Sequence, residues 1–220
     1  MANDAVELIK ELVDVAARIA PPDAIEWLTA QLVYDPTRFA PAFSAAGRRL
    51  GTTPIGTDDA RSLHIPWPAG TGVDECGRAA LVLAAIGSLD ASEHVALVRD
   101  LIRRGEVRER QAVLRVLAAL PDPARYVEIA VDACRTNVQS VFEAIACDNA
   151  YPARHFPDPA FNQLVLKALF IGAPVGRILE LTARTSDELV RMVEAYASER
   201  RAAGRTIPDD VRLIRRGDPP

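Results

Sequence analysis

The sequence predicts an all-α protein of stacked antiparallel helix pairs, either a HEAT-like α-solenoid or a helical bundle. Apolar residues return every three or four positions along most of the 220 residues, whereas the alternation typical of β-strands is almost absent. Proline and N-capping residues divide the chain into segments of helix length. The tetrapeptides LAAI at Leu83 and LAAL at Leu117 stand 34 residues apart, a spacing typical of helical repeats.

Residues 1–50 are expected to form an N-terminal helical unit. The first helix is expected to bury a stripe of Val6, Ile9, Leu12 (or Val13) and Ala16, and the second a stripe of Ile25, Leu28, Leu32 and Val33. Pro21 and Pro22 separate the two helices. A third helix is expected over 36–50, with a kink or a break at Pro41.

Residues 51–72 differ in composition from the helices on either side. They are rich in Gly, Pro, Thr and Asp and show no periodicity. Loops this long in a compact protein are usually functional or disordered. Because the segment also contains Ile65 and Trp67, we expect an ordered crossover loop that packs against the helices.

Residues 73–214 are expected to form stacked helix pairs. The first pair comprises a helix over 73–86 and one beginning at Asp90, which forms a capping box with Glu93. The second comprises a helix over 106–120 and one that Asp122 caps. A third pair begins near Val138, and Asp158-Pro159 and a capping box of Thr185 with Glu188 start later helices. Residues 215–220 are expected to be a frayed tail, and residues 1–220 a single domain.

The composition is typical of a globular protein, with 49% hydrophobic and 25% charged residues. With a net charge of -4, the sequence lacks the excess of basic residues that is typical of nucleic-acid-binding proteins. The longest apolar run, 79–86, is far shorter than the roughly 20 residues that cross a bilayer. The N-terminus does not resemble a signal peptide, and three cysteines without CxxC spacing are expected to be reduced. These features predict a cytoplasmic location.

Motifs of common enzyme classes are missing from the sequence. His64, His94 and His155 are scattered, without the spacing of a metal site. The chain contains neither GxSxG nor a glycine-rich phosphate loop. We therefore predict no metal and no cofactor, and assign no catalytic residue.

Polar residues crowd together in residues 134–172. Thr136 and Gln139 match a capping box, and Tyr151, which precedes Pro152, is expected to be extended. Arginine, lysine, asparagine and tyrosine suit a small polar or anionic ligand. The candidate ligand-binding residues are Arg135, Asn137, Glu143, Asn149, Tyr151, Arg154, Asn162, Lys167, Tyr196 and Arg200. The alternative is a buried structural network in which Arg135 caps a helix and Glu143 pairs with Arg154 or Lys167.

The string CRTNVQSVFEAIACDNAYPARHFPDPAFNQLVLKALFIGAPVGRI resembles the EboA family of bacterial proteins. YASERRAAGRTIPDDV, from Tyr196, and DECGRAALVLAAI, from Asp74, fit the same family. The resemblance implies an all-helical protein encoded in a bacterial and cyanobacterial gene cluster, with neighbours resembling a prenyltransferase, a TatD-like hydrolase, a sugar-phosphate cyclase and TIM-barrel proteins. It also implies a role in moving metabolites, such as scytonemin precursors, toward the periplasm.

Three functions follow as hypotheses. The first is an accessory protein of metabolite biosynthesis and traffic, whose partner is a small polar metabolite, another protein of the same cluster, or both. The second is an enzyme acting on a cyclitol- or sugar-derived intermediate. The third is a helical-repeat scaffold that only docks other proteins. A closed pocket with a perturbed titratable group would favour the enzyme, and a broad groove or exposed apolar patch would favour the scaffold.

Overall fold

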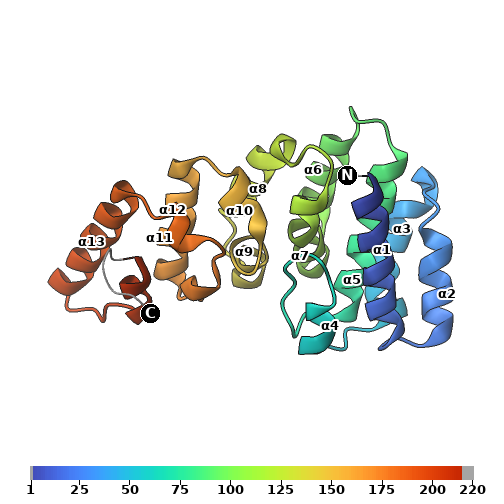
Figure 1. Ribbon diagram of the computed structural model, residues 1–220, viewed down its shortest axis with the longest axis horizontal. Helices are drawn as coiled ribbons and strands as arrows, with labels where there is room; N and C mark the ends of the chain where they lie inside the picture. The colour runs from blue at the N-terminus through green and yellow to red at the C-terminus, as the bar shows by residue number, and fades with distance from the viewer. Residues whose placement is uncertain (1, 215–220) are drawn as a thin grey trace.

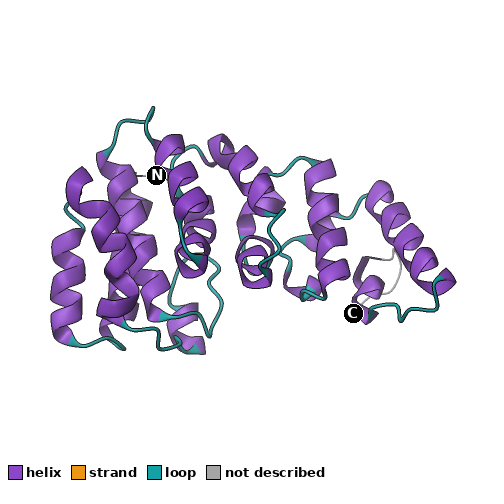
Figure 2. Cartoon of the chain, turned by 180° about the vertical axis from the view of Figure 1, so that it is seen from behind, coloured by secondary structure: helices purple, strands orange, loops and turns teal. Residues whose placement is uncertain are grey.

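The computed structural model describes residues 2–214, and all named elements within that range are helical (Figures 1 and 2). The predicted all-α class is confirmed. The first half of the chain contains α1 (Ala2–Ala17), α2 (Pro22–Gln31), α3 (Pro36–Leu50), α4 (Thr57–Arg61), α5 (Val73–Ser88), α6 (His94–Arg104) and α7 (Val107–Val116). The 3₁₀ helices η1 (Leu117–Ala119) and η2 (Pro123–Tyr126) then lead into α8 (Val127–Ala133). The remainder contains α9 (Gln139–Ala146), α10 (Ala150–His155), α11 (Asp158–Ile171), η3 (Val175–Arg177), α12 (Leu181–Arg184), α13 (Asp187–Ala202) and η4 (Asp209–Ile214).

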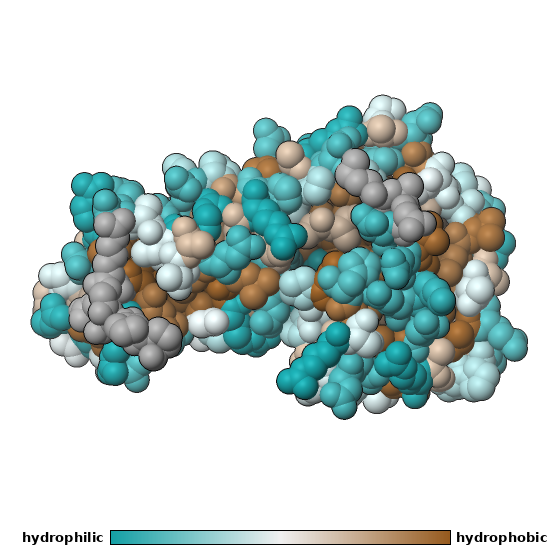
Figure 3. Space-filling view, viewed as in Figure 1, coloured by the Kyte–Doolittle hydropathy of each residue, from teal (hydrophilic) through white to brown (hydrophobic). Residues whose placement is uncertain are grey.

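The helices follow one another along the long axis of the molecule. Figure 1 shows α1–α7 at one end and α13 at the other. The helix α5 packs against α1, α3 and α7, and contacts then run in order from α7 to α9, α11 and α13. In parallel, α6 packs against α7 and α8. In the space-filling view, hydrophilic residues cover much of the visible surface, with hydrophobic patches among them (Figure 3).

The centre of the N-terminal end is α5. All of its residues from Val73 to Leu83 are buried, as expected of a helix surrounded by other helices. Gly77 allows α3 to approach closely, because a Cβ at this position would lie 2.2 Å from Leu50 Cδ1. The α3–α5 contact therefore depends on a residue without a side chain.

The first three helices differ in detail from the sequence prediction. Leu8, Leu12 and Val15 face the core, whereas the side of α1 that carries Val6 is turned to solvent and Val6 is 66% exposed. Val33 is 79% exposed because it follows the last turn of α2. The predicted break in α3 is wrong, since the helix continues through Pro41. Pro41 lies on an exposed face, where water can satisfy the carbonyl group that its missing N–H leaves free.

Residues 51–72, predicted to be a crossover loop that packs against the helices, do pack against them and also contain the short helix α4. Trp67 is only 6% exposed, and its Nε1 donates a hydrogen bond of 2.9 Å to Thr71 Oγ1. The ends of the loop are joined by backbone hydrogen bonds, including Ile55 N to Thr71 O (2.8 Å) and Val73 N to Thr53 O (2.9 Å). Burial of an aromatic side chain of this size stabilises the loop by about 2–3 kcal/mol.

Several predicted helix starts are displaced. The helix α6 begins at His94, because residues 91–93 form a turn in which Glu93 N donates to Asp90 O. Asp122 does not cap η2; its φ of 46° is in the left-handed region. Ser186, rather than Thr185, caps α13 by accepting from Leu189 N. The predicted helix start at Asp158 is confirmed.

The prediction that Tyr151 is extended is wrong. Tyr151 lies in the first turn of α10, with Pro152 next to it. A proline is tolerated there because the first N–H groups of a helix have no partner within the helix.

Side-chain hydrogen bonds recur between residues about 35 positions apart. Five of them join Arg78 to Phe43, Arg108 to Asp74, Arg125 to Ala91, Asn149 to Leu114, and Asp210 to Val175, with separations of 34 or 35. This spacing is close to the interval of 34 residues between LAAI at Leu83 and LAAL at Leu117. The predicted frayed tail, residues 215–220, lies outside the described residues. Among residues 2–214, no helix has the length and apolar character needed to cross a membrane.

Candidate functional site

Asn149 and Tyr151, two of the predicted site residues, are buried and bonded to the backbone. Asn149 Nδ2 donates to the carbonyl groups of Leu114 and Ala144, both at 2.9 Å. Its Oδ1 accepts from Tyr151 N and so caps α10. The Tyr151 hydroxyl donates to Pro123 O at 2.5 Å, and burial raises the pKa of this phenol. The two side chains therefore connect α10 to α7, α9 and η2.

Lys167 has a similar role one helix further along the chain. From α11, its Nζ donates to Cys134 O (2.5 Å) and Thr136 O (2.6 Å), at the end of α8. The same ammonium group lies 5.2 Å from the centroid of the Phe142 ring. A cation at this position satisfies carbonyl groups that have no partner within the helix.

Four predicted site residues lie nearer the surface. Arg135 pairs with Asp132 (3.2 Å) and Arg154 with Glu180 (3.6 Å), and in both pairs the side chains are exposed. Glu143 accepts from Gln139 Nε2 at 2.8 Å. The alternative pairing of Glu143 with Arg154 or Lys167 is absent among the described residues. Asn137 is exposed.

The last three predicted residues belong to α11 and α13. Asn162 is buried, and its Oδ1 has no hydrogen-bond partner among the described residues. Tyr196 donates to Leu169 O at 3.2 Å, and Arg200 Nε donates to Thr206 O at 2.6 Å. Eight of the ten residues thus make polar contacts, and these contacts lead to separate backbone positions and surface partners. Binding of a ligand by any of them stays a prediction.

A buried ionic cluster between α5 and α7 was not predicted. It comprises Asp74, Glu75 and Arg78 of α5 with Arg108 and Arg115 of α7, and we call it the α5–α7 ionic cluster. Asp74, which is fully buried, accepts from Arg78 Nη1 and from Arg108 Nε and Nη2. Glu75 accepts from Arg115 Nε at 3.0 Å. Three charges within five residues of an otherwise apolar segment are the sequence feature that could have indicated it.

The α5–α7 ionic cluster also fixes neighbouring parts of the chain. Arg78 Nε donates to Phe43 O at 3.1 Å, which connects the cluster to α3. The hydrogen bond with Asp74 raises the pKa of Arg108. Gly72, the last residue of the crossover loop, has no room for a side chain because a Cβ would lie 1.9 Å from Arg108 Nη2. The cluster therefore positions the junction between the loop and α5.

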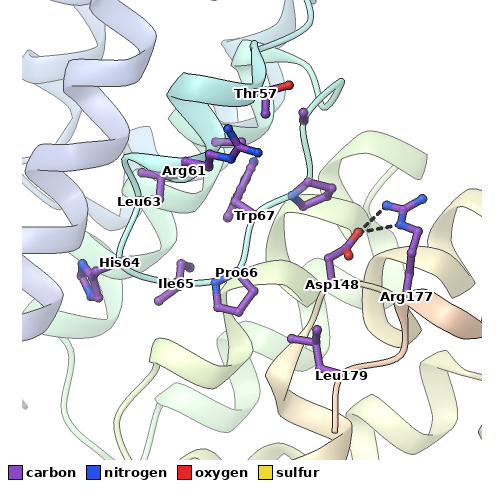
Figure 4. A pocket seen from close by; sticks show the side chains of 13 residues that line it. Thr57, Arg61, Leu63, His64, Ile65, Pro66, Trp67, Asp148, Arg177 and Leu179 are labelled. Carbon is purple, nitrogen blue, oxygen red and sulfur yellow. Dashed lines mark hydrogen bonds and ion pairs between the residues drawn. The ribbon is translucent and has the colours of Figure 1, made fainter. Parts of the chain in front are cut away.

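An open groove lies between the crossover loop and the segment around η3 (Figure 4). We call it the crossover groove, and its volume is about 710 Å³. The loop contributes Thr57, Ala60, Arg61, Leu63, His64, Ile65, Pro66, Trp67, Pro68 and Ala69, and the opposite side contributes Asp148, Arg177 and Leu179. Two parts of the chain that lie about 80 to 120 residues apart in sequence thus form its walls.

Asp148 and Arg177 form an ion pair on the side of the crossover groove opposite the loop (Figure 4). Arg177 Nε donates to Asp148 Oδ2 at 2.8 Å, and Asp148 N donates to Arg177 O, also at 2.8 Å. The hydrogen bond with Asp148 raises the pKa of Arg177. Across the groove, Arg61 is exposed and His64 Nδ1 lies 2.8 Å from Glu11 Oε2. The groove therefore offers donors and acceptors beside the apolar Pro66 and Leu179.

The cysteines are poorly suited to nucleophilic chemistry. Burial raises the pKa of Cys76 and Cys134 to about 12 and that of Cys147 to about 11. The reactive form of cysteine is the thiolate, so these thiols are unreactive near neutral pH. Within residues 2–214, no group of three or more His, Cys, Asp or Glu residues is arranged to hold a metal ion.

Comparison with known proteins identifies a family for this chain. A family model described as metabolite traffic protein EboA matches residues 12–214. Neither a curated protein nor a solved structure matches the chain with significance. The matched range includes both walls of the crossover groove and all five residues of the α5–α7 ionic cluster.

Proposed function

The chain belongs to the EboA family, and we propose that it is an accessory protein of metabolite traffic that binds a small, hydroxyl-rich metabolite in the crossover groove. The observation that carries this proposal is the groove itself, a space of about 710 Å³ between an ordered loop and a distant helical segment. Spaces of about 300–1,000 Å³ are typical of small-molecule sites.

The lining of the crossover groove supports a polar ligand that carries many hydroxyl groups. Asp148 can accept hydrogen bonds, and Arg177 and Arg61 can donate them. Because Asp148 and Arg177 already neutralise each other, this wall carries little unbalanced charge. Pro66 and Leu179 supply apolar surface against which the C–H groups of a ring can pack.

The groove is held by a scaffold that we propose to be one domain of stacked helix pairs with a HEAT-like arrangement. Sequential contacts from α5 to α13 and hydrogen bonds across 34 or 35 residues support this interpretation. In this proposal the protein acts in the cytoplasm. It passes its ligand to other proteins of the same gene cluster, which move it toward the periplasm.

Small-molecule capture tests the proposal. The purified protein is incubated with a metabolite extract of cells lacking its gene, and native mass spectrometry measures the retained mass. We expect wild type to retain a compound, and Asp148→Asn and Arg177→Met to lose at least about nine-tenths of it, because each removes part of the polar wall. Arg191→Met is the matched control, since Arg191 is exposed, pairs with Glu188 and lies outside the lining.

The same measurement separates a carrier from an enzyme. A carrier releases the compound with unchanged mass and chromatographic retention, whereas an enzyme acting on a cyclitol- or sugar-derived intermediate releases a compound that differs in mass or, after an isomerisation, in retention. If the two groove variants melt like wild type and retain as much compound as Arg191→Met, the ligand does not bind in the crossover groove.

A further inference from the structure

A second hollow lies between α6, α7, α8 and the start of α9, and arginine side chains dominate its polar lining. We call it the arginine hollow; its volume is about 520 Å³. Its lining consists of Arg99, Ile102, Arg103, Arg110, Glu128, Ile129, Asp132, Ala133, Thr136 and Val141. It shares no lining residue with the crossover groove, so an inference about it does not depend on the function proposed above.

Arg110 is the feature that points to a ligand. Its Nε is buried and has no hydrogen-bond partner among the described residues. A guanidinium nitrogen withdrawn from water without a partner destabilises the folded protein. Natural proteins rarely leave such groups unsatisfied unless a ligand, an ion or water completes them.

The charges around Arg110 leave the arginine hollow positive. Arg99, like Arg110, makes no ion pair within residues 2–214, and Arg103 has only a loose contact with Asp100 at 3.5 Å. The carboxylates of the lining are Glu128 and Asp132, and Asp132 already pairs with Arg135 at 3.2 Å. Three guanidinium groups therefore face one carboxylate without a partner and one that is already paired.

The remaining lining is apolar. Ile102, Ile129, Ala133 and Val141 come from α6, α8 and α9 and form a hydrocarbon surface beside the arginines. A ligand that fits both features has an oxyanion at one end, which a guanidinium group binds through two parallel hydrogen bonds. Its other end is a hydrocarbon body that the isoleucines remove from water. We propose that the arginine hollow binds a small organic anion with an apolar body, and that Arg110 binds its oxyanion.

Calorimetric titration with three probes tests this assignment. The probes are 4-phenylbutyrate, its neutral amide, and inorganic phosphate. We expect the carboxylate to bind at least tenfold more tightly than the amide, which lacks the charge, and than phosphate, which lacks the apolar body. Arg110→Met should weaken carboxylate binding at least tenfold without lowering the melting temperature, because methionine preserves most of the apolar stem and removes the unpartnered nitrogen.

Control variants locate the binding. Arg104→Met should bind like wild type, because Arg104 lies on α6 with a 3.5 Å contact to Asp100 but outside the lining. Asp148→Asn, in the crossover groove, should also bind like wild type. Arg99→Met is a second test that does not depend on the folding of the Arg110 variant, since Arg99 is exposed; we expect a threefold to tenfold loss. Equal binding of amide and carboxylate, equal binding by Arg110→Met and Arg104→Met, or no carboxylate binding would overturn the proposal.

Discussion

The α5–α7 ionic cluster and residues 134–167 both contain buried polar side chains, but these side chains have different partners. In the cluster, charged groups bind charged groups between α5 and α7, as Arg108 binds Asp74. In residues 134–167, Asn149, Tyr151 and Lys167 bind backbone carbonyl groups instead. The ionic cluster thus joins side chains of α5 to side chains of α7. In residues 134–167, side chains are joined to backbone carbonyl groups near helix ends.

The difference follows from the number of helix ends in each region. Every helix end leaves up to four backbone groups without a partner within the helix. Between Leu117 and Ile171 the chain forms η1, η2, α8, α9, α10 and α11, most of them short, so many carbonyl groups need side-chain donors. The 16-residue helix α5 pairs most of its backbone groups within the helix. Its buried charged side chains therefore pair with charged side chains of α5 and α7. Polar residues that crowd between short helices thus indicate hydrogen bonds from side chains to the backbone at least as strongly as they indicate a ligand site.

Removing charge from the ionic cluster is expected to have the largest effect. Asp74→Asn leaves Arg78 and Arg108 without their shared carboxylate, and breaking a buried pair of this kind typically costs about 3–5 kcal/mol. Urea unfolding followed by circular dichroism measures the loss. Asp100→Asn is the control, because Asp100 is exposed and its contacts with Arg103 and Arg104 are 3.5 Å long; we expect a change below about 0.5 kcal/mol. A loss below 1 kcal/mol for Asp74→Asn would show that the cluster is not a structural network.

A smaller loss is expected for Asn149→Ala. This change removes the cap of α10 and the donors to Leu114 O and Ala144 O, for a combined cost of about 2–3 kcal/mol. Asn137→Ala is the matched control in the same segment, because Asn137 is exposed and should contribute less than about 0.5 kcal/mol. Equal unfolding free energies for the two variants would contradict a structural role for Asn149.

Lys167→Met should cost about 1.5–2 kcal/mol. Methionine retains the apolar stem over Phe142, but the carbonyl groups of Cys134 and Thr136 lose their donor. Arg135→Met, which removes only an exposed pair with Asp132, serves as the control and should be nearly neutral. Thermal unfolding measures both variants. If Lys167→Met unfolds like wild type but loses metabolite retention in the capture experiment, Lys167 belongs to a binding site after all.

The sequence was sufficient to predict the fold class because helical periodicity is a local property. The helix start at Asp158 and the interval of 34 residues are both visible without a structure. The exposed side of α1 could not be predicted from the sequence, because Val6 and Leu8 both fit a helical stripe and only tertiary packing selects between them. The partners of buried polar groups could not be predicted either. The contact between Asn149 and Leu114 spans 35 residues, and the two walls of the crossover groove are farther apart in sequence still.

The smallest expected effect is a pH dependence that is specific to residues 134–167. His155 lies 4.8 Å from the Tyr151 ring, and burial, followed by the nearby Arg154 cation, lowers the pKa of its imidazole below the ordinary value of 6.5. The unfolded chain therefore binds a proton at a pH where the folded protein does not, so this residue lowers stability as the pH falls below about 6.5. The penalty is absent above that pH and is complete once the pH is below the folded pKa.

The variant His155→Gln isolates this contribution. Its unfolding free energy should decrease less than that of wild type between pH 7.5 and pH 5, because the group that titrates differently in the two states is gone. Arg154→Met should give an intermediate slope, since removal of the neighbouring cation brings the pKa of His155 closer to its ordinary value while burial still lowers it. Urea titrations at four or five pH values measure all three slopes. Parallel curves for wild type and His155→Gln would show that His155 titrates alike in the folded and unfolded states. A steeper decrease for the variant would reverse the sign and place a carboxylate, rather than a cation, beside the imidazole.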